Sequence, residues 1–138
     1  MSTTSFTMYH ADCVGNAANC LYPHKVTVTD AASMKAAMNK DYVFSAFKNS
    51  YRNCENFLSA DALAVDCDND HSDCPEAWIT PDTIAAKFQG VAFAVHYSRH
   101  HNLQKNDKSP RPRFHVIFPI EAVTDSTEYA NALNLVTD

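Results

Sequence analysis

Two aspartates at the end of a short apolar run have a spacing that suits metal chemistry. The run Ala62 to Cys67 has the length and composition of a buried strand, and Asp66 and Asp68 are separated by one residue. Alternate residues of a strand point to the same face, so the two carboxylates can share one cation. Magnesium and manganese prefer oxygen ligands of this kind, completed by substrate phosphates. We therefore expect a divalent-cation site here, with an acidic surface turn as the alternative.

A second candidate group lies on a later apolar segment. Arg113 and His115 share one face of the strand expected from Phe114 to Pro119. An arginine fork and a shorter histidine donor aimed the same way can bind a triphosphate. We expect Ser98 to reach the same sheet and the Asp66 strand to be the neighbouring strand. The alternative for His115 is an ordinary core histidine.

The net charge of -5 conceals two opposed blocks. Residues 61–76 hold six acidic side chains and no basic one, whereas residues 99–113 hold five basic side chains and one acid. These blocks indicate either a cation site beside a phosphate site or two solvated loops. In the first case, binding to a nucleic-acid backbone would weaken as salt rises. The residues expected to make such contacts are Arg99, Lys105, Lys108 and Arg111.

Composition excludes several protein classes. The 138 residues suit one domain, and only Gly15 and Gly90 are glycines, which rules out a P-loop and a dinucleotide-binding fingerprint. No apolar run approaches the roughly 18 residues of a membrane span, and the N-terminus lacks the pattern of a secretory signal. We expect a soluble, cytoplasmic protein with no membrane partner. Its five cysteines, an odd number at irregular spacings, are then expected to be reduced.

The order of predicted elements indicates an α+β fold. From Ala62 onward the order is strand, helix, strand, strand, helix, which is typical of a split βαβ or RNA-recognition-like sheet that lacks its last strand. We expect a single domain, with an N-terminal αβ unit at residues 1–60 and an RNA-recognition-like unit at residues 61–138, its helices on one face. The strands are predicted at residues 5–10, 25–29, 56–58, 62–67, 91–97 and 114–119, and the helices at residues 31–38, 42–48, after Thr80 and after Asp125.

Three segments together resemble the archaeo-eukaryotic primase superfamily. They are Ala64-Val65-Asp66-Cys67-Asp68-Asn69-Asp70-His71, His96-Tyr97-Ser98-Arg99 and Pro112-Arg113-Phe114-His115-Val116-Ile117-Phe118-Pro119. The likeness covers about residues 40–120 and is greatest to primase-polymerase domains of bacterial phages and plasmids. In that superfamily, a D-x-D strand holds the catalytic cations, and a motif of serine, basic residue and histidine grips the incoming nucleotide.

The resemblance implies template-directed nucleotidyl transfer in phage or plasmid replication. It assigns Asp66, Asp68 and His115 to catalysis, Mg²⁺ or Mn²⁺ to Asp66 and Asp68, and the nucleoside triphosphate to Ser98, Arg99, Arg113 and His115. Single-stranded DNA is the implied template, and a helicase domain or protein is a partner that the resemblance allows. The third acidic motif of the family lies on the strand after the last helix, where only Asp138 stands. We therefore expect an incomplete site, as in a fragment or a partly active chain.

Other interpretations of the same residues stay open. Cys67, His71 and Cys74 could contribute to a zinc site, although Cys67 alternates away from the acid pair. Trp78 is expected to pack at the start of a helix, with base stacking as the alternative. One rival function is a two-histidine replication-initiator nuclease with a tyrosine nucleophile such as Tyr129. Another is a non-catalytic nucleic-acid-binding module, for which Phe93, Phe114 and Phe118 would have to be exposed rather than in the core.

Overall fold

The computed structural model describes residues 5–98 and 100–137. These residues form an α+β protein with two antiparallel sheets and three α-helices, so the predicted α+β class is confirmed. Two compact units are present: residues 1–63 with 119–138, and residues 64–118. The strands are β1 (Phe6–His10), β2 (His24–Val28), β3 (Tyr42–Val43), β4 (Ser45–Phe47), β5 (Phe57–Cys67), β6 (Ala94–Tyr97) and β7 (Phe114–Val123), and the α-helices are α1 (Ala31–Ala37), α2 (Pro81–Lys87) and α3 (Ser126–Thr137).

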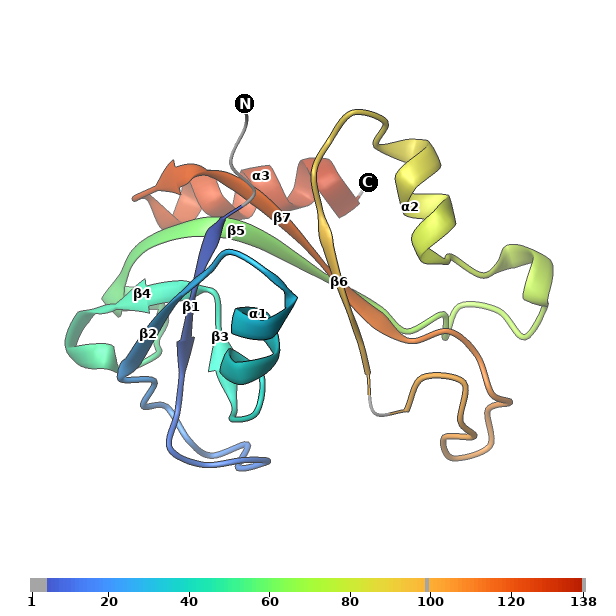
Figure 1. Ribbon diagram of the computed structural model, residues 1–138, viewed down its shortest axis with the longest axis horizontal. Helices are drawn as coiled ribbons and strands as arrows, with labels where there is room; N and C mark the ends of the chain where they lie inside the picture. Colours follow the sequence, from blue (N-terminus) through green and yellow to red (C-terminus); the bar gives the residue numbers. More distant parts are fainter. Residues whose placement is uncertain (1–4, 99, 138) are drawn as a thin grey trace. The chain divides into compact units, whose positions relative to one another are not determined.

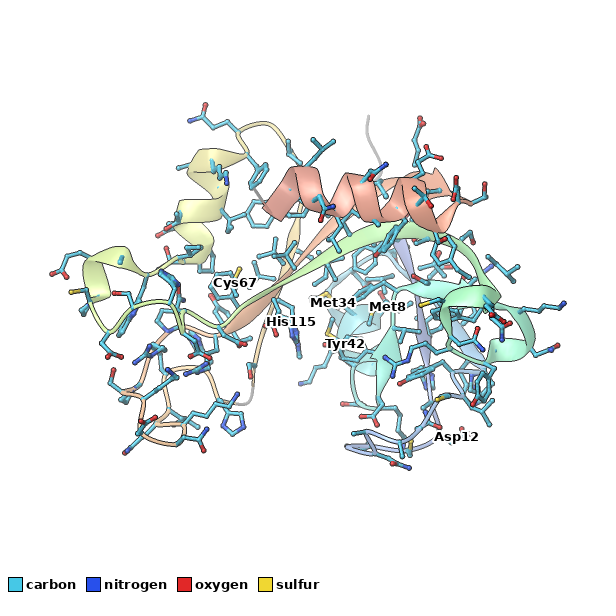
Figure 2. All side chains as sticks on the ribbon, turned by 180° about the vertical axis from the view of Figure 1, so that it is seen from behind. Met8, Asp12, Met34, Tyr42, Cys67 and His115 are labelled. Atoms are coloured by element: carbon cyan, nitrogen blue, oxygen red, sulfur yellow. The ribbon has the colours of Figure 1, made fainter. Side chains whose placement is uncertain are left out.

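The first unit contains a three-stranded sheet in the order β2-β1-β3. Asp30 is the N-cap of its helix α1, and its carboxylate accepts a hydrogen bond from the Ser33 N–H. The Ser33 hydroxyl in turn accepts from the Asp30 N–H. Met8 on β1 is fully buried, and its side chain lies with Met34 and Tyr42 on the side of the sheet that α1 covers (Figure 2). Apolar residues from a helix and two strands thus form the core of this sheet.

One sequence prediction for this unit is wrong. Residues 42–48 were expected to be helical, but they form β3 and β4 and then begin a 3-10 turn at Lys48–Ser50. Tyr42 pairs with His10 on β1, and Ser45 pairs with Ala60 on β5. The aromatic residues of this segment suit strands, and pairing on both sides overrides the weak local tendency toward helix.

The second sheet has the order β4-β5-β7-β6, in which β4 pairs antiparallel with β5, and β6 with β7 (Figure 1). The predicted adjacency of the Asp66 strand and the His115 strand is confirmed, because β5 and β7 are neighbours. The strand predicted at residues 91–97 is shorter in the structure, and the strands predicted at 62–67 and 114–119 are longer. The place beside β5 that a last strand would take in an RNA-recognition-like sheet holds β4.

Helix α2 covers one face of the strands in residues 64–118. Thr80 caps it by accepting from the Thr83 N–H, and Pro81 occupies its first turn, so the helix begins after Thr80 as predicted. The helix buries Ile84, and the ring of Phe88 after its end lies 5.1 Å from the ring of Phe118 on β7. Phe114 and Phe118 are buried core residues. His115 lies on the opposite face of β7, where its neighbours Arg113 and Ile117 are buried but its own side chain is 34% exposed, so His115 is accessible for chemistry.

Candidate functional site

Three polar side chains form a row across β5, β7 and β6. His115 Nε2 lies 3.4 Å from Asp66 Oδ1, and His96 stands directly opposite His115 in the β6–β7 register. The two imidazole rings are stacked, with centroids 6.2 Å apart and planes 16° from parallel. Figure 2 shows His115 on the side of the ribbon away from Cys67, which points toward α2. His96 is the residue that the sequence prediction missed. Pairing the two predicted strands antiparallel could have found it.

The electrostatics of this row centre on Asp66. Burial raises the pKa of Asp66, the charge of His115 opposes that shift, and the nearby Asp68 carboxyl raises the pKa further. The charge of Lys105 in the basic loop lowers the pKa of Asp66 as the last of these causes. Burial lowers the pKa of His96, and the charge of His115 lowers it too. The site thus concentrates negative charge at Asp66 and Asp68, with cationic groups on its border.

Asn69 shapes the loop that carries the acidic residues. Its backbone is left-handed, with φ of 57°, a conformation that asparagine tolerates better than most residues. The buried side chain donates to the carbonyls of Ile79 and Pro112 at 2.9 and 2.8 Å and accepts from the Ile79 N–H at 2.7 Å. These three hydrogen bonds hold the turn between Asp68 and Asp70. An asparagine two residues after the end of a strand was the available signal for this role.

Arg113 lies beneath the acidic loop rather than in solvent. Its side chain is 1% exposed, and Nη1 lies 2.9 Å from Asp70 Oδ1 and 3.9 Å from Asp68 Oδ1. All three guanidinium nitrogens are buried, and none of them makes a hydrogen bond within the part of the chain that the structure describes, so the contact with Asp70 is an ion pair. The predicted face shared with His115 is therefore turned toward carboxylates. The grip of Arg113 on a triphosphate stays a prediction.

Arg111 is a structural residue of the same region. Its side chain is fully buried, and all of its N–H donors have partners: the carbonyls of Asn69, Ser72 and Ser109, the Ser109 hydroxyl and the Asp73 carboxylate. Its guanidinium carbon lies 5.3 Å from the centre of the Trp78 ring. With every donor already used, this placement gives no support to the expected contact between Arg111 and nucleic acid.

The two charge blocks therefore meet instead of forming separate solvated loops. The buried Arg111 and Arg113 of the basic block pair with Asp73 and Asp70 of the acidic block. Trp78 belongs to this arrangement, since its indole N–H donates to the Ser72 carbonyl and its ring faces Arg111. These two arginines therefore form ion pairs within the fold, so fewer positively charged side chains of the basic block are available to bind a ligand.

Hydrogen bonds join the two ends of the loop between β6 and β7. The Ser98 N–H donates to the Arg113 carbonyl at 2.9 Å, and the Ser98 hydroxyl accepts from the His100 N–H. The Arg113 N–H donates to His101 Nδ1 at 3.1 Å. Lys105 and Lys108 pair across the turn at the loop tip and are half-buried. Arg99, predicted to bind nucleotide, lies outside the described residues.

The donor set fits a divalent cation that also needs substrate oxygens. Among residues 5–98 and 100–137, no group of three or more His, Cys, Asp or Glu side chains converges as a complete metal site. Asp66 and Asp68 keep 58% and 41% of their side chains exposed, and the pKa of Asp66 is raised first by burial and then by its like-charged neighbour. One or two accessible carboxylates are what magnesium commonly takes from a protein when phosphates complete the shell.

The residues considered for zinc do not converge in this part of the fold. Cys67 is buried, and burial is the largest cause that raises the pKa of its thiol. The negative charges of Asp66 and Asp68 raise this pKa further. His71 Nε2 lies 2.9 Å from the Ala77 carbonyl, and Cys74 is exposed on the loop. A raised thiol pKa disfavours the thiolate that zinc requires.

The comparisons with known proteins returned no match to a family model, a curated protein or a solved structure. Within the described residues, no helix has the length and apolar character needed to cross a membrane.

Proposed function

We propose that this chain carries the nucleotide-binding core of a primase-polymerase-like nucleotidyltransferase. The observation that supports it best is the approach of Asp66 and His115 across β5 and β7, 3.4 Å apart, with Asp68 on the same strand end. The strands lie in the order β5-β7-β6 in the sheet, and α2 connects β5 to β6 along the chain. This arrangement suits an RNA-recognition-like sheet. The three segments that resemble the primase superfamily supply these same residues.

Each side chain has a part in this proposal. Asp66 and Asp68 would hold the divalent cation, which would supply positive charge for activating an attacking 3′-hydroxyl and stabilising the leaving pyrophosphate. His115 donates a hydrogen bond to a phosphate oxygen of the incoming nucleoside triphosphate, and Asp66 orients its ring. Lys105, close enough to affect Asp66, adds positive charge beside the triphosphate. The Lys105–Lys108 turn offers cations to the backbone of a single-stranded DNA template.

Calorimetry with Mn²⁺ and a nucleoside triphosphate tests the proposal. We expect metal-dependent binding in the wild type and its loss in Asp66→Asn and His115→Ala. The chain offers a matched control pair outside the site, because His24 Nε2 lies 2.6 Å from Asp12 Oδ1. Asp12→Asn and His24→Ala should bind as the wild type does. Unchanged binding in both site variants would refute the assignment.

The two rivals predict different results. A non-catalytic nucleic-acid-binding module would bind nucleotide or DNA with no dependence on Mn²⁺ or Asp66. The burial of Phe114 and Phe118 removes two of its expected stacking rings. A tyrosine nuclease would form a covalent adduct with single-stranded DNA. The Tyr129 hydroxyl donates to the Ala62 carbonyl at 3.0 Å, and burial raises its pKa, which disfavours a nucleophilic phenolate.

A further inference from the structure

Two carboxylates compete for one buried arginine in the candidate site. Arg113 Nη1 lies 2.9 Å from Asp70 Oδ1 but 3.9 Å from Asp68 Oδ1. Both aspartate side chains are about equally accessible, at 42% and 41% exposed. The difference between them is therefore the partner each holds, and only Asp70 makes the close ion pair.

A buried guanidinium requires a counter-charge, because an unpaired charge away from water is strongly destabilising. Nε, Nη1 and Nη2 of Arg113 are all buried and make no hydrogen bond in the described parts of the chain, so this guanidinium is compensated by ion pairing alone. Within the described residues, the ion pair with Asp70 is thus the contact that keeps the guanidinium of Arg113 away from Asp68. Without Asp70, Asp68 would be the nearest carboxylate left to neutralise Arg113.

We propose that Asp70 is a positioning residue for the divalent-cation site. By neutralising Arg113, it leaves the Asp68 carboxylate available to a divalent cation instead of an arginine. This inference rests on the proposed function, which assigns Asp66 and Asp68 to the cation. In this proposal Arg113 is a buried positive charge that must stay paired with Asp70 when the cation binds at Asp66 and Asp68.

The same loop contains a matched ion pair with no link to Asp68. Arg111 Nη2 lies 2.7 Å from Asp73 Oδ1, and this arginine is also fully buried. Because the other donors of Arg111 bond to carbonyls and a hydroxyl, loss of Asp73 does not release it toward the cation site. Asp73→Asn therefore removes one carboxylate charge and one arginine contact from this loop without acting on Asp68.

Direct Mn²⁺ binding to the whole chain, followed by electron paramagnetic resonance at constant ionic strength and without nucleotide, tests the inference. We expect Asp70→Asn to weaken Mn²⁺ binding about 10- to 100-fold, the range for lost outer-sphere partners. Adding Arg113→Met should restore affinity to within about threefold of wild type, because the competing cation is gone. Asp73→Asn should stay within about threefold, well short of the outer-sphere loss. Equal losses in Asp70→Asn and Asp73→Asn, or no rescue in a folded double variant, would overturn the inference.

An Asp68→Asn background separates this mechanism from general loss of negative charge, and it does not depend on Arg113→Met folding. If Asp70 acts through Asp68, adding Asp70→Asn to Asp68→Asn should change Mn²⁺ affinity no further. A second loss of about tenfold or more, the size expected for an outer-sphere partner, would contradict the proposal. A wild-type chain that binds no Mn²⁺ would reject the proposed function and this inference with it, whereas normal wild-type binding with an unaffected Asp70→Asn would reject the inference alone.

Discussion

Asp66 and His115 face each other from neighbouring strands, with 3.4 Å between Oδ1 and Nε2. The pair joins the end of β5 to the start of β7, and His96 extends the row onto β6. Carboxylate and imidazole are thus placed on the sheet face opposite α2. Their support comes from buried residues around them, chiefly Asn69, Arg111 and Arg113.

Loss of Arg111 should affect stability rather than nucleic-acid binding. Arg111→Ala removes the hydrogen bonds that join the loop to Asn69, Ser72 and Ser109, and it leaves buried carbonyls without donors. We expect the free energy of unfolding to fall by about 3 kcal/mol, because a large buried side chain and its hydrogen bonds are lost together. Urea denaturation measures it. A stable variant with weakened DNA binding would contradict the structural role.

Asn69 should show both a backbone and a side-chain contribution. Asn69→Gly loses three hydrogen bonds but keeps a residue suited to positive φ, and we expect a loss of about 2 kcal/mol. Asn69→Ala should lose about 1 kcal/mol more, because alanine is strained in the left-handed region. The comparison requires only unfolding curves. Equal stability of the two variants would show that the left-handed turn is not maintained.

Lys105 should contribute to ligand binding through its charge. Because Lys105 is half-buried and its charge lowers the pKa of Asp66, Lys105→Ala should weaken triphosphate or single-stranded DNA binding. The slope of log affinity against log salt should decrease in magnitude by about one, because one fewer counterion is released on binding. Fluorescence anisotropy at several salt concentrations provides the measurement, with exposed Lys25 of β2 as the control position. An unchanged salt slope would exclude Lys105 from the interface.

Asp73 should make the fold sensitive to acid. The hydrogen bond and the charge of Arg111 lower the pKa of Asp73 from its ordinary 3.8. A carboxyl whose pKa is depressed in the folded state stabilises the fold above its unfolded pKa, and that contribution is lost as pH falls through the folded pKa. The Tm difference between wild type and Asp73→Asn should therefore be constant above about pH 5 and shrink below about pH 4. A difference that persists unchanged in stronger acid would show that the carboxylate charge is not involved.

The sequence was sufficient for elements whose local signals agree with their packing. Thr80 and Pro81 mark the start of α2, and the alternation of apolar residues marks β5 and β7. The adjacency of these two strands followed from the split βαβ order and placed Asp66 beside His115. Residues 42–48 failed because their strand pairing is with β1 and β5, which no local pattern in that segment shows.

The supporting residues of the site were harder to predict. Arg111 and Arg113 look like surface cations in a basic block, and their burial depends on contacts with the acidic loop some 40 residues earlier in the chain. His96 could be recognised only after β6 was paired with β7 in the correct register. Long-range pairing therefore determines which charges are available to a ligand and which are used within the fold.

A crystal structure of the chain with Mn²⁺ and a non-hydrolysable nucleoside triphosphate tests the central claim most directly. We expect anomalous density for manganese at the carboxylates of Asp66 and Asp68, and phosphate oxygens within hydrogen-bonding distance of His115 Nε2. Manganese at another place in the chain, or a triphosphate on the α2 face of the sheet, would contradict it.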